Sequence, residues 1–191
     1  MTPTHLPGRV AVPHQQRGTT LERFNTACAD ELRHTLLTCL RSLRWAHRIT
    51  AHRPYPTPEA LLAASDEAAY DLTPADLTEA LAGETLPVLP EDAYSAAHTA
   101  LDAANAAYEA KFGHVFVICL DEVPPNECLD HVLTAIRSRL TNDPEEERVV
   151  AWEELRRLAR GRLLDSLRGA GNCATSHNAP ALGTQQDTPP T

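Results

Sequence analysis

The chain has 191 residues, with 17 basic against 26 acidic side chains and a net charge of −9. That length suits one compact domain with a real hydrophobic core. The acidic excess argues against a nucleic-acid-binding protein, which needs clustered Lys and Arg to displace counterions. No apolar run reaches the roughly 20 residues that span a bilayer, and residues 1–18 lack the apolar stretch of a signal peptide. We therefore expect a cytoplasmic protein that binds neither nucleic acid nor membrane.

The cysteines and histidines give no sign of a disulfide framework or a metal centre. Five cysteines are an odd number at scattered spacings, and none forms a C-x-x-C pair. A chain of this length does not depend on disulfides, so we expect reduced thiols. The nine histidines include no H-E-x-x-H motif and no Cys/His cluster. The sequence therefore predicts no metal site.

The periodic part of the chain begins after a polar N-terminal stretch. Residues 1–19 and 169–191 are rich in Pro, Gly, Gln and Thr without periodicity, which predicts two disordered tails around one domain, 20–168. From Thr20 to about His47, leucines at steps of three and four form one apolar stripe, which predicts a first long helix. Those leucines are Leu32, Leu36, Leu40 and Leu43. Two prolines in 52–56 end that helix, because proline cannot donate a backbone hydrogen bond.

Two further helices begin at Thr-Pro pairs. Thr57-Pro58 predicts a short helix through Leu61 and Leu62, since Thr caps a helix well and Pro suits its first turn. Thr73-Pro74 repeats the pattern, with Asp76 at the third helical position, and this helix ends near Gly83.

The second half of the domain continues the helical pattern with one exception. A loop over 84–90 precedes a helix from Glu91 to about Lys111. Residues 114–120 are rich in β-formers but have no partner strand, so they predict a buried extended connector or a helix start. Helices follow over about 125–140 and from the Asp143-Pro144 cap to about Leu167. The sequence predicts an all-α, single-domain bundle of about six to eight helices.

One charged side chain stands on an apolar helix face. Leu155, Leu158 and Arg162 are spaced at i, i+3 and i+7. An inward guanidinium is costly to bury unless an anion meets it. Two interpretations are open: the head reaches a boundary carboxylate while the stem packs, or it binds an anionic ligand.

Several motifs, in order along 20–168, resemble the OHCU decarboxylase family. They are Arg23-Phe24-Asn25, Trp45, Arg53-Pro54-Tyr55, N-A-A-Y-E-A-K-F-G at 105–113, V-F-V-I-C at 115–119, R-L-T-N-D-P-E at 139–145 and R-G-R-L at 160–163. The family converts 2-oxo-4-hydroxy-4-carboxy-5-ureidoimidazoline (OHCU) to (S)-allantoin in urate breakdown. The resemblance implies a carboxy-lyase of purine catabolism with a small anionic ureide substrate and no cofactor. Family members commonly form homodimers, so a homodimer is one of the assembly states open to this chain.

The chain departs from the family at the catalytic positions. The family's catalytic His, in H-P-x-[IL]-G, aligns with Gly83, and the following Pro aligns with Glu84. The S-x-x-E-Q element aligns with 95–99, so its Glu is His98 and its Gln is Thr99. The resemblance implies substrate contacts by Ser95, Thr99, Arg162 and a connector that lines the site with backbone groups: Phe116, Val117, Ile118, Cys119 and Leu120.

The missing histidine leaves two hypotheses. Decarboxylation needs a group that polarises a carbonyl and then delivers a proton, which a His can do and Gly83 cannot. In the first hypothesis the chain is an OHCU decarboxylase that uses His98 as a substitute acid. In the second it is a catalytically inactive relative that binds a small ligand or a protein partner. Glu84 disfavours the first, because its charge repels a carboxylated substrate.

Overall fold

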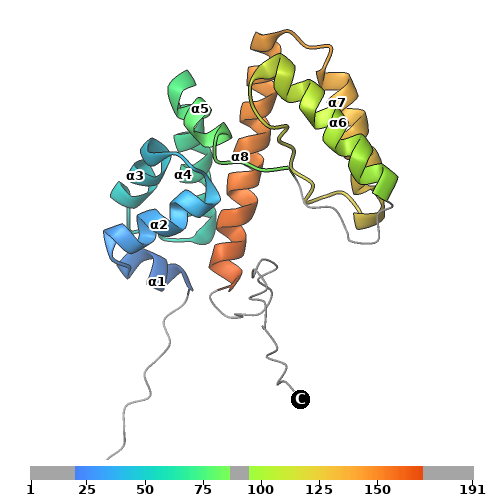
Figure 1. Ribbon diagram of the computed structural model, residues 1–191. Helices are drawn as coiled ribbons and strands as arrows, with labels where there is room; N and C mark the ends of the chain where they lie inside the picture. The colour runs from blue at the N-terminus through green and yellow to red at the C-terminus, as the bar shows by residue number, and fades with distance from the viewer. Residues whose placement is uncertain (1–19, 87–94, 170–191) are drawn as a thin grey trace, which may run out of the picture.

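The computed structural model describes residues 20–86 and 95–169, and the predicted tails, 1–19 and 169–191, lie outside that description except for Gly169, which is the last residue of the final helix. The described residues form eight α-helices and one 3₁₀ helix, which confirms the all-α prediction (Figure 1). In chain order they are α1 (Thr20–Thr26), α2 (Ala29–Cys39), α3 (Leu43–Ala51), α4 (Pro58–Tyr70), α5 (Pro74–Leu81), α6 (Ser95–Phe112), η1 (Pro125–Glu127), α7 (Cys128–Arg139) and α8 (Pro144–Gly169).

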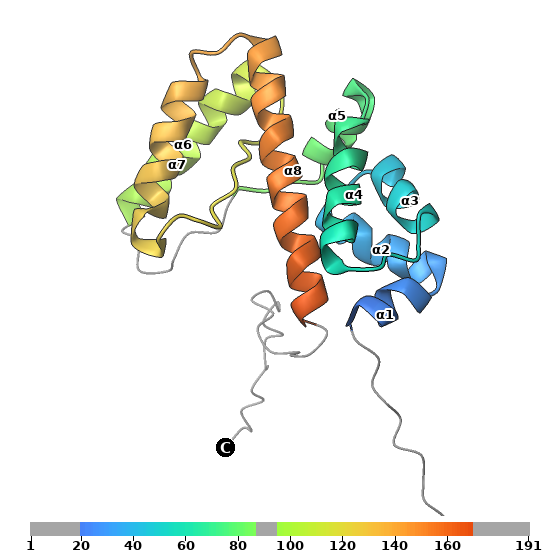
Figure 2. The same ribbon diagram turned by 180° about the vertical axis from the view of Figure 1, so that it is seen from behind.

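The long helix α8 separates two groups of helices. Helices α1–α5 pack along one side of α8, and α6 and α7 form a hairpin on the other side (Figures 1 and 2). Each group has its own apolar core. The larger core includes Leu36, Trp45, Leu61, Leu77 and Leu163, and the smaller core includes Leu101, Tyr108, Phe116, Val132 and Ile136.

The prediction of one long helix from Thr20 to about His47 is wrong. The chain forms three helices there, α1 to α3, because Leu40 adopts an extended conformation and the Ser42 side chain caps α3 by accepting from Trp45 N. The turn puts Leu43 on a different face from the other leucines. Leu32, Leu36 and Leu40 are buried, whereas Leu43 is 56 % exposed.

Three of the predicted helix starts agree with the structure, while the start predicted at Glu91 lies outside the described residues. Thr57 caps α4 and Thr73 forms a full capping box with Asp76 at the start of α5. Asp143 Oδ1 accepts from the backbone N–H groups of Glu145 and Glu146 at 2.8 and 2.9 Å and so begins α8. Helix α4 extends to Tyr70, beyond the short helix that the sequence predicted.

Hydrogen bonds join the R-F-N motif at 23–25 to the R-P-Y motif at 53–55. Asn25 Nδ2 donates to Tyr55 O, and Tyr55 N donates to Asn25 Oδ1, both at 2.9 Å. Arg53 Nη1 donates to the carbonyl oxygens of Phe24 and Ala27, at 3.2 and 2.8 Å, and so satisfies the C-terminal end of α1. These residues hold α1 against the turn between α3 and α4.

The connector 114–120 has no regular secondary structure; its residues 116–119 are buried and the others are partly buried, which agrees with the first of the two predicted states. It follows Gly113, whose φ of 79° ends α6 in the left-handed conformation that glycine allows. Because its side chains alternate in direction, Phe116 and Ile118 pack in the smaller core while Val117 packs in the larger core. The connector therefore joins the two cores beside α8.

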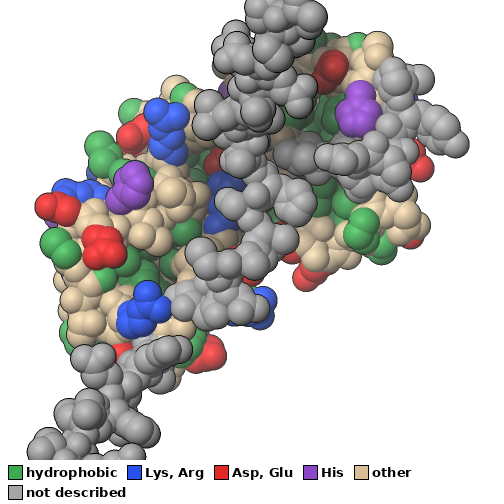
Figure 3. All heavy atoms as spheres, turned by 60° about the horizontal axis from the view of Figure 1, so that its bottom comes forward, with side chains coloured by type: hydrophobic (Ala, Val, Ile, Leu, Met, Phe, Trp, Pro, Cys, Tyr) green, Lys and Arg blue, Asp and Glu red, His purple; other side chains and the backbone are tan. Residues whose placement is uncertain are grey.

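Both charge signs occur together on one face of the molecule. On the face that Figure 3 shows, Lys and Arg side chains are interspersed with Asp and Glu over the α1–α5 side. Among residues 20–86 and 95–169, no helix combines the length and apolar character needed to cross a membrane.

Candidate functional site

Arg162 is engaged by a carboxylate of its own chain. Its Nη1 and Nη2 donate to Glu84 Oε1 and Oε2 at 2.8 and 2.7 Å, and Nη1 also donates to Cys39 O at 3.1 Å. The Glu84 side chain is 6 % exposed and that of Arg162 is 38 % exposed. The hydrogen bonds that Arg162 donates to Glu84 raise the pKa of Arg162. The arrangement is the first of the two interpretations of Arg162, a guanidinium that meets a boundary carboxylate.

At Gly83, where the sequence analysis expects the family's catalytic His, the structure leaves no open space for a side chain. An ideal Cβ at Gly83 would lie 2.2 Å from Arg41 Cδ and 2.8 Å from Arg41 Cβ. A side chain at this position therefore requires Arg41 to move. The loop after α5 packs against Arg41 because glycine has no side chain here.

The backbone of the connector is held by side chains from three helices. Asn105 Oδ1 of α6 accepts from Phe116 N at 3.1 Å, and Arg139 Nη1 of α7 donates to Val117 O at 2.7 Å. Glu154 Oε2 of α8 accepts from Cys119 N at 2.7 Å. Three of the backbone groups that the sequence analysis assigned to a substrate therefore already have intramolecular partners.

A buried polar network fixes the Arg139 side chain that holds Val117. Glu147 Oε1 accepts from Arg139 Nε at 2.8 Å and from the Tyr108 hydroxyl, while Glu147 Oε2 accepts from Asn142 Nδ2 at 2.9 Å. The side chains of Arg139 and Glu147 are only 9 % and 1 % exposed. Burial, and then the hydrogen bond to Glu147, raise the pKa of the Tyr108 hydroxyl, so it stays protonated as a donor.

A cavity of about 310 Å³ lies beside the Arg162–Glu84 pair. It is lined by residues of α5, the loop after it and the α6–connector junction: Thr78, Leu81, Ala82, Glu84, Phe112, Gly113, His114 and Val115. The His114 ring lies 5.4 Å from the Tyr108 ring in an edge-on arrangement, and its Nδ1 is 3.0 Å from Val115 O. The sequence analysis did not select His114. Its place directly after the F-G pair that ends the N-A-A-Y-E-A-K-F-G motif is the signal that could have indicated it.

The other predicted site residues lie in two different places. One place is beside α8, where residues 116–119 of the connector are buried. An ideal Cβ at Gly161 of α8 would lie 2.5 Å from Asp121 Oδ2, so the chain just after the connector closely approaches α8 beside Arg162. Leu120 is partly buried in the smaller core.

The residues of the S-x-x-E-Q position are on the first turns of α6. His98 and Thr99 are exposed there, and neither lines the cavity beside Glu84. Helix α6 begins at its end distant from α8 (Figures 1 and 2). Ser95 begins α6, and its side chain lies outside the described residues.

The thiols near Arg162 are not activated. Burial raises the pKa of Cys39 and of Cys119, so both remain neutral thiols at pH 7. Within the part of the chain that the structure describes, no three His, Cys, Asp or Glu side chains come together as a candidate metal site.

Comparison with known proteins identifies the family. The model of the family described as OHCU decarboxylase matches residues 25–89 and 86–164. The chain belongs to the OHCU decarboxylase family. No curated protein sequence matches it. Two solved structures share its fold at 20–22 % sequence identity.

This chain spans a different share of the length of each of the two solved structures. A crystal structure of (S)-allantoin synthase matches with a TM-score of 0.60 and 22 % identity over 78 % of this chain, which spans only 54 % of that protein. A crystal structure of OHCU decarboxylase in the presence of (S)-allantoin matches with a TM-score of 0.61 and 20 % identity, covering 69 % of this chain and 96 % of that one. At this identity the likeness establishes the fold.

Proposed function

We propose that this chain is a non-catalytic member of the OHCU decarboxylase family, a binding module that does not decarboxylate OHCU. The observation that carries the proposal is the pair of hydrogen bonds, 2.8 and 2.7 Å long, from the Arg162 guanidinium to the Glu84 carboxylate. A bidentate carboxylate is the partner that a guanidinium prefers, so Glu84 occupies the group on which a carboxylated substrate would depend.

The second requirement of the reaction is a proton donor, and the site lacks the family's donor. Gly83 has no side chain, and Arg41 fills the space beside it. The Cys119 N–H, another donor of the expected site, is engaged by Glu154. A positioned acid contributes about 10²–10⁴-fold to such a step. The site has lost the family's acid, and its two donors, the Arg162 guanidinium and the Cys119 N–H, are engaged by Glu84 and Glu154. These observations support a chain that does not decarboxylate OHCU.

The second candidate is the family reaction itself, conversion of OHCU to (S)-allantoin without a cofactor in the cytoplasm. Family membership and the retained Arg162 favour it, and so does the His114 imidazole in the cavity beside Glu84. In this candidate the substrate carboxylate displaces Glu84 from Arg162. His114 or His98 then protonates the carbanion that is left by the loss of CO₂. Domain 20–168 is the functional unit in both candidates.

One experiment separates the two candidates. Freshly generated OHCU is added to the purified full chain, and the formation of (S)-allantoin is followed by circular dichroism. We expect OHCU to decay at the same rate as without protein and to give racemic allantoin. Formation of (S)-allantoin above that rate, in proportion to protein concentration, would refute the non-catalytic proposal.

Matched variants assign the roles if activity is found. His114→Ala abolishes it when His114 is the acid, while His98→Ala abolishes it when His98 is the acid. Arg162→Gln raises KM in both cases, because it removes a contact made to the substrate carboxylate.

A further inference from the structure

The Glu84 carboxylate lies between Arg162 and the cavity of about 310 Å³ beside the pair. Glu84 lines that cavity, whereas Arg162 is not among its described lining residues. The Glu84 side chain is only 6 % exposed, and its two oxygens accept from the guanidinium at 2.8 and 2.7 Å. Among the described residues that line the cavity, Glu84 is the one acidic residue. A small molecule in the cavity therefore meets Glu84 and not Arg162.

The loop after α5 holds Glu84 in this position. Gly83 N donates to Ala80 O at 3.0 Å and Glu84 N donates to Leu81 O at 3.1 Å, so the backbone leaves α5 in a tight turn. Gly83 has no side chain, which lets this turn lie against Arg41. Because the backbone is fixed in this way, the Glu84 carboxylate competes for Arg162 at a high effective concentration compared with a free carboxylate.

Opening the ion pair in the parent leaves a buried charge without its partner. A bidentate pair of a guanidinium and a carboxylate is roughly twice as strong as neutral hydrogen bonds. A free carboxylate that takes the guanidinium leaves the Glu84 carboxylate unpaired in a position that is 94 % buried, because its side chain is 6 % exposed. An unpaired buried carboxylate is strongly unfavourable. The parent therefore disfavours every ligand that needs a carboxylate at Arg162.

We propose that Glu84 is a built-in carboxylate ligand of Arg162 that determines the specificity of this site. Glu84 keeps free carboxylates from the guanidinium, and a short monocarboxylate binds there only when the Glu84 carboxylate is removed. This role rests on the proposed function, a site that does not decarboxylate OHCU, and adds that a ligand of the parent places no carboxylate at Arg162.

Glu84→Ala tests the proposal, because alanine keeps Cβ and the atoms that it removes match one acetate ion. The variant leaves Arg162 without its carboxylate and extends the cavity toward the guanidinium. We expect its Tm in chloride to fall below that of the parent. At equal ionic strength, about 100 mM acetate restores about half of that fall or more. Acetamide, which has the shape of acetate without its charge, restores none of it.

Calorimetric titration measures the same specificity directly. We expect saturable acetate binding to Glu84→Ala and an affinity at least about tenfold lower in the parent. The double variant Glu84→Ala/Arg162→Gln has no guanidinium for the ion, so acetate neither binds to it nor raises its Tm.

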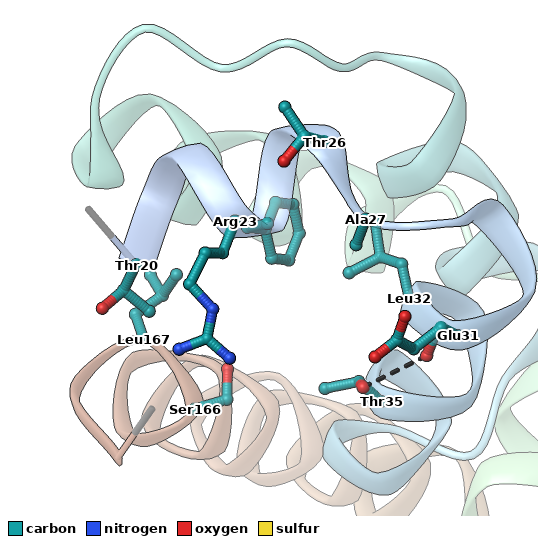
Figure 4. Close-up of a pocket in the computed structure, with 10 residues that line it drawn as sticks. Thr20, Arg23, Thr26, Ala27, Glu31, Leu32, Thr35, Ser166 and Leu167 are labelled. Atoms are coloured by element: carbon teal, nitrogen blue, oxygen red, sulfur yellow. Dashed lines mark hydrogen bonds between the residues drawn. The ribbon is translucent and has the colours of Figure 1, made fainter. Parts of the chain in front are cut away.

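A matched control removes a carboxylate from a different cavity. Glu31 lines a cavity of about 390 Å³ between α1, α2 and the end of α8 (Figure 4). The Glu31 side chain is exposed there, so its loss leaves no buried cation without a partner. Acetate therefore gives Glu31→Ala no more stabilisation than it gives the parent.

Three results overturn the proposal: equal acetate affinity in the parent and Glu84→Ala, no effect of acetate on the folded variant, or an equal effect in the double variant. If Glu84→Ala does not fold in chloride, far-UV circular dichroism in acetate replaces the Tm. Helix that returns in acetate but not in acetamide supports the proposal, and helix that does not return overturns it. The proposed function fails separately, since it is refuted by conversion of OHCU and not by acetate binding.

Discussion

Glu147 holds the connector through Arg139, and Glu147→Gln tests how much the fold depends on that network. The parent carboxylate, 1 % exposed, accepts from Arg139, Tyr108 and Asn142. A glutamine keeps the shape but removes the charge, and its NH₂ group turns one acceptor into a donor that faces another donor. Breaking one side of a buried ion pair costs about 3–5 kcal/mol. For a domain of this size each kcal/mol lowers Tm by about 2–4 °C, so we expect a fall of about 6–20 °C.

Thermal unfolding followed by circular dichroism at pH 7 measures the effect. The matched control is Glu145→Gln in the same turn of α8, where the parent side chain is 71 % exposed and pairs with Arg148. That change costs at most about 1 kcal/mol. Hydrogen exchange provides a second readout, because loss of the Arg139 anchor at Val117 O speeds exchange of the connector amides. A Tm for Glu147→Gln within the error of the Glu145→Gln control would refute the reasoning.

Three more predictions concern the site and the motifs. Gly83→His lowers the free energy of unfolding by about 1–3 kcal/mol, because the new Cβ overlaps the Arg41 side chain. The double variant with Arg41→Ala regains most of that loss, and urea unfolding measures both variants. Asp76→Asn costs about 1 kcal/mol at pH 7 through the capping box. The Thr73 hydroxyl holds the pKa of Asp76 in the folded protein below its usual value. The difference in free energy of unfolding between the parent and the variant is therefore full above the pKa of Asp76 in the unfolded chain, and it disappears as the pH falls through the pKa in the folded protein. A difference that stays constant from pH 7 to pH 2 would contradict this. Asn25→Ala lowers the free energy of unfolding in urea by about 1–3 kcal/mol, because it removes both hydrogen bonds to the Tyr55 backbone. A loss below a few tenths of a kcal/mol would show that water replaces these hydrogen bonds.

Local patterns predicted the helix starts well and the helix faces less well. Thr57, Thr73 and Asp143 cap helices because the capping hydrogen bonds join residues two or three positions apart. The break at Ser42 was missed, because the leucine spacing continues across it and the extended state of Leu40 depends on packing within the larger core.

The candidate site shows the same division between local and distant contacts. Arg162 could be selected from its place on an apolar face, but its partner Glu84 lies 78 positions away in the chain. The absence of the family's catalytic His at Gly83 is a prediction from the motif, whereas the Arg41 side chain beside Gly83 is a tertiary contact that only the structure shows. His114 joined the site only through the cavity that α5, α6 and the connector enclose together.

The sequence by itself determined an all-α domain of the OHCU decarboxylase type, because periodicity, caps and motif order depend on neighbours along the chain. Its net charge of −9 said nothing about the site. Only the tertiary structure decided which groups meet Arg162 and Cys119 N–H, and both meet carboxylates, Glu84 and Glu154. The physical reason is that a buried charge or donor takes the partner that packing brings within hydrogen-bond distance, and sequence separation does not limit that choice.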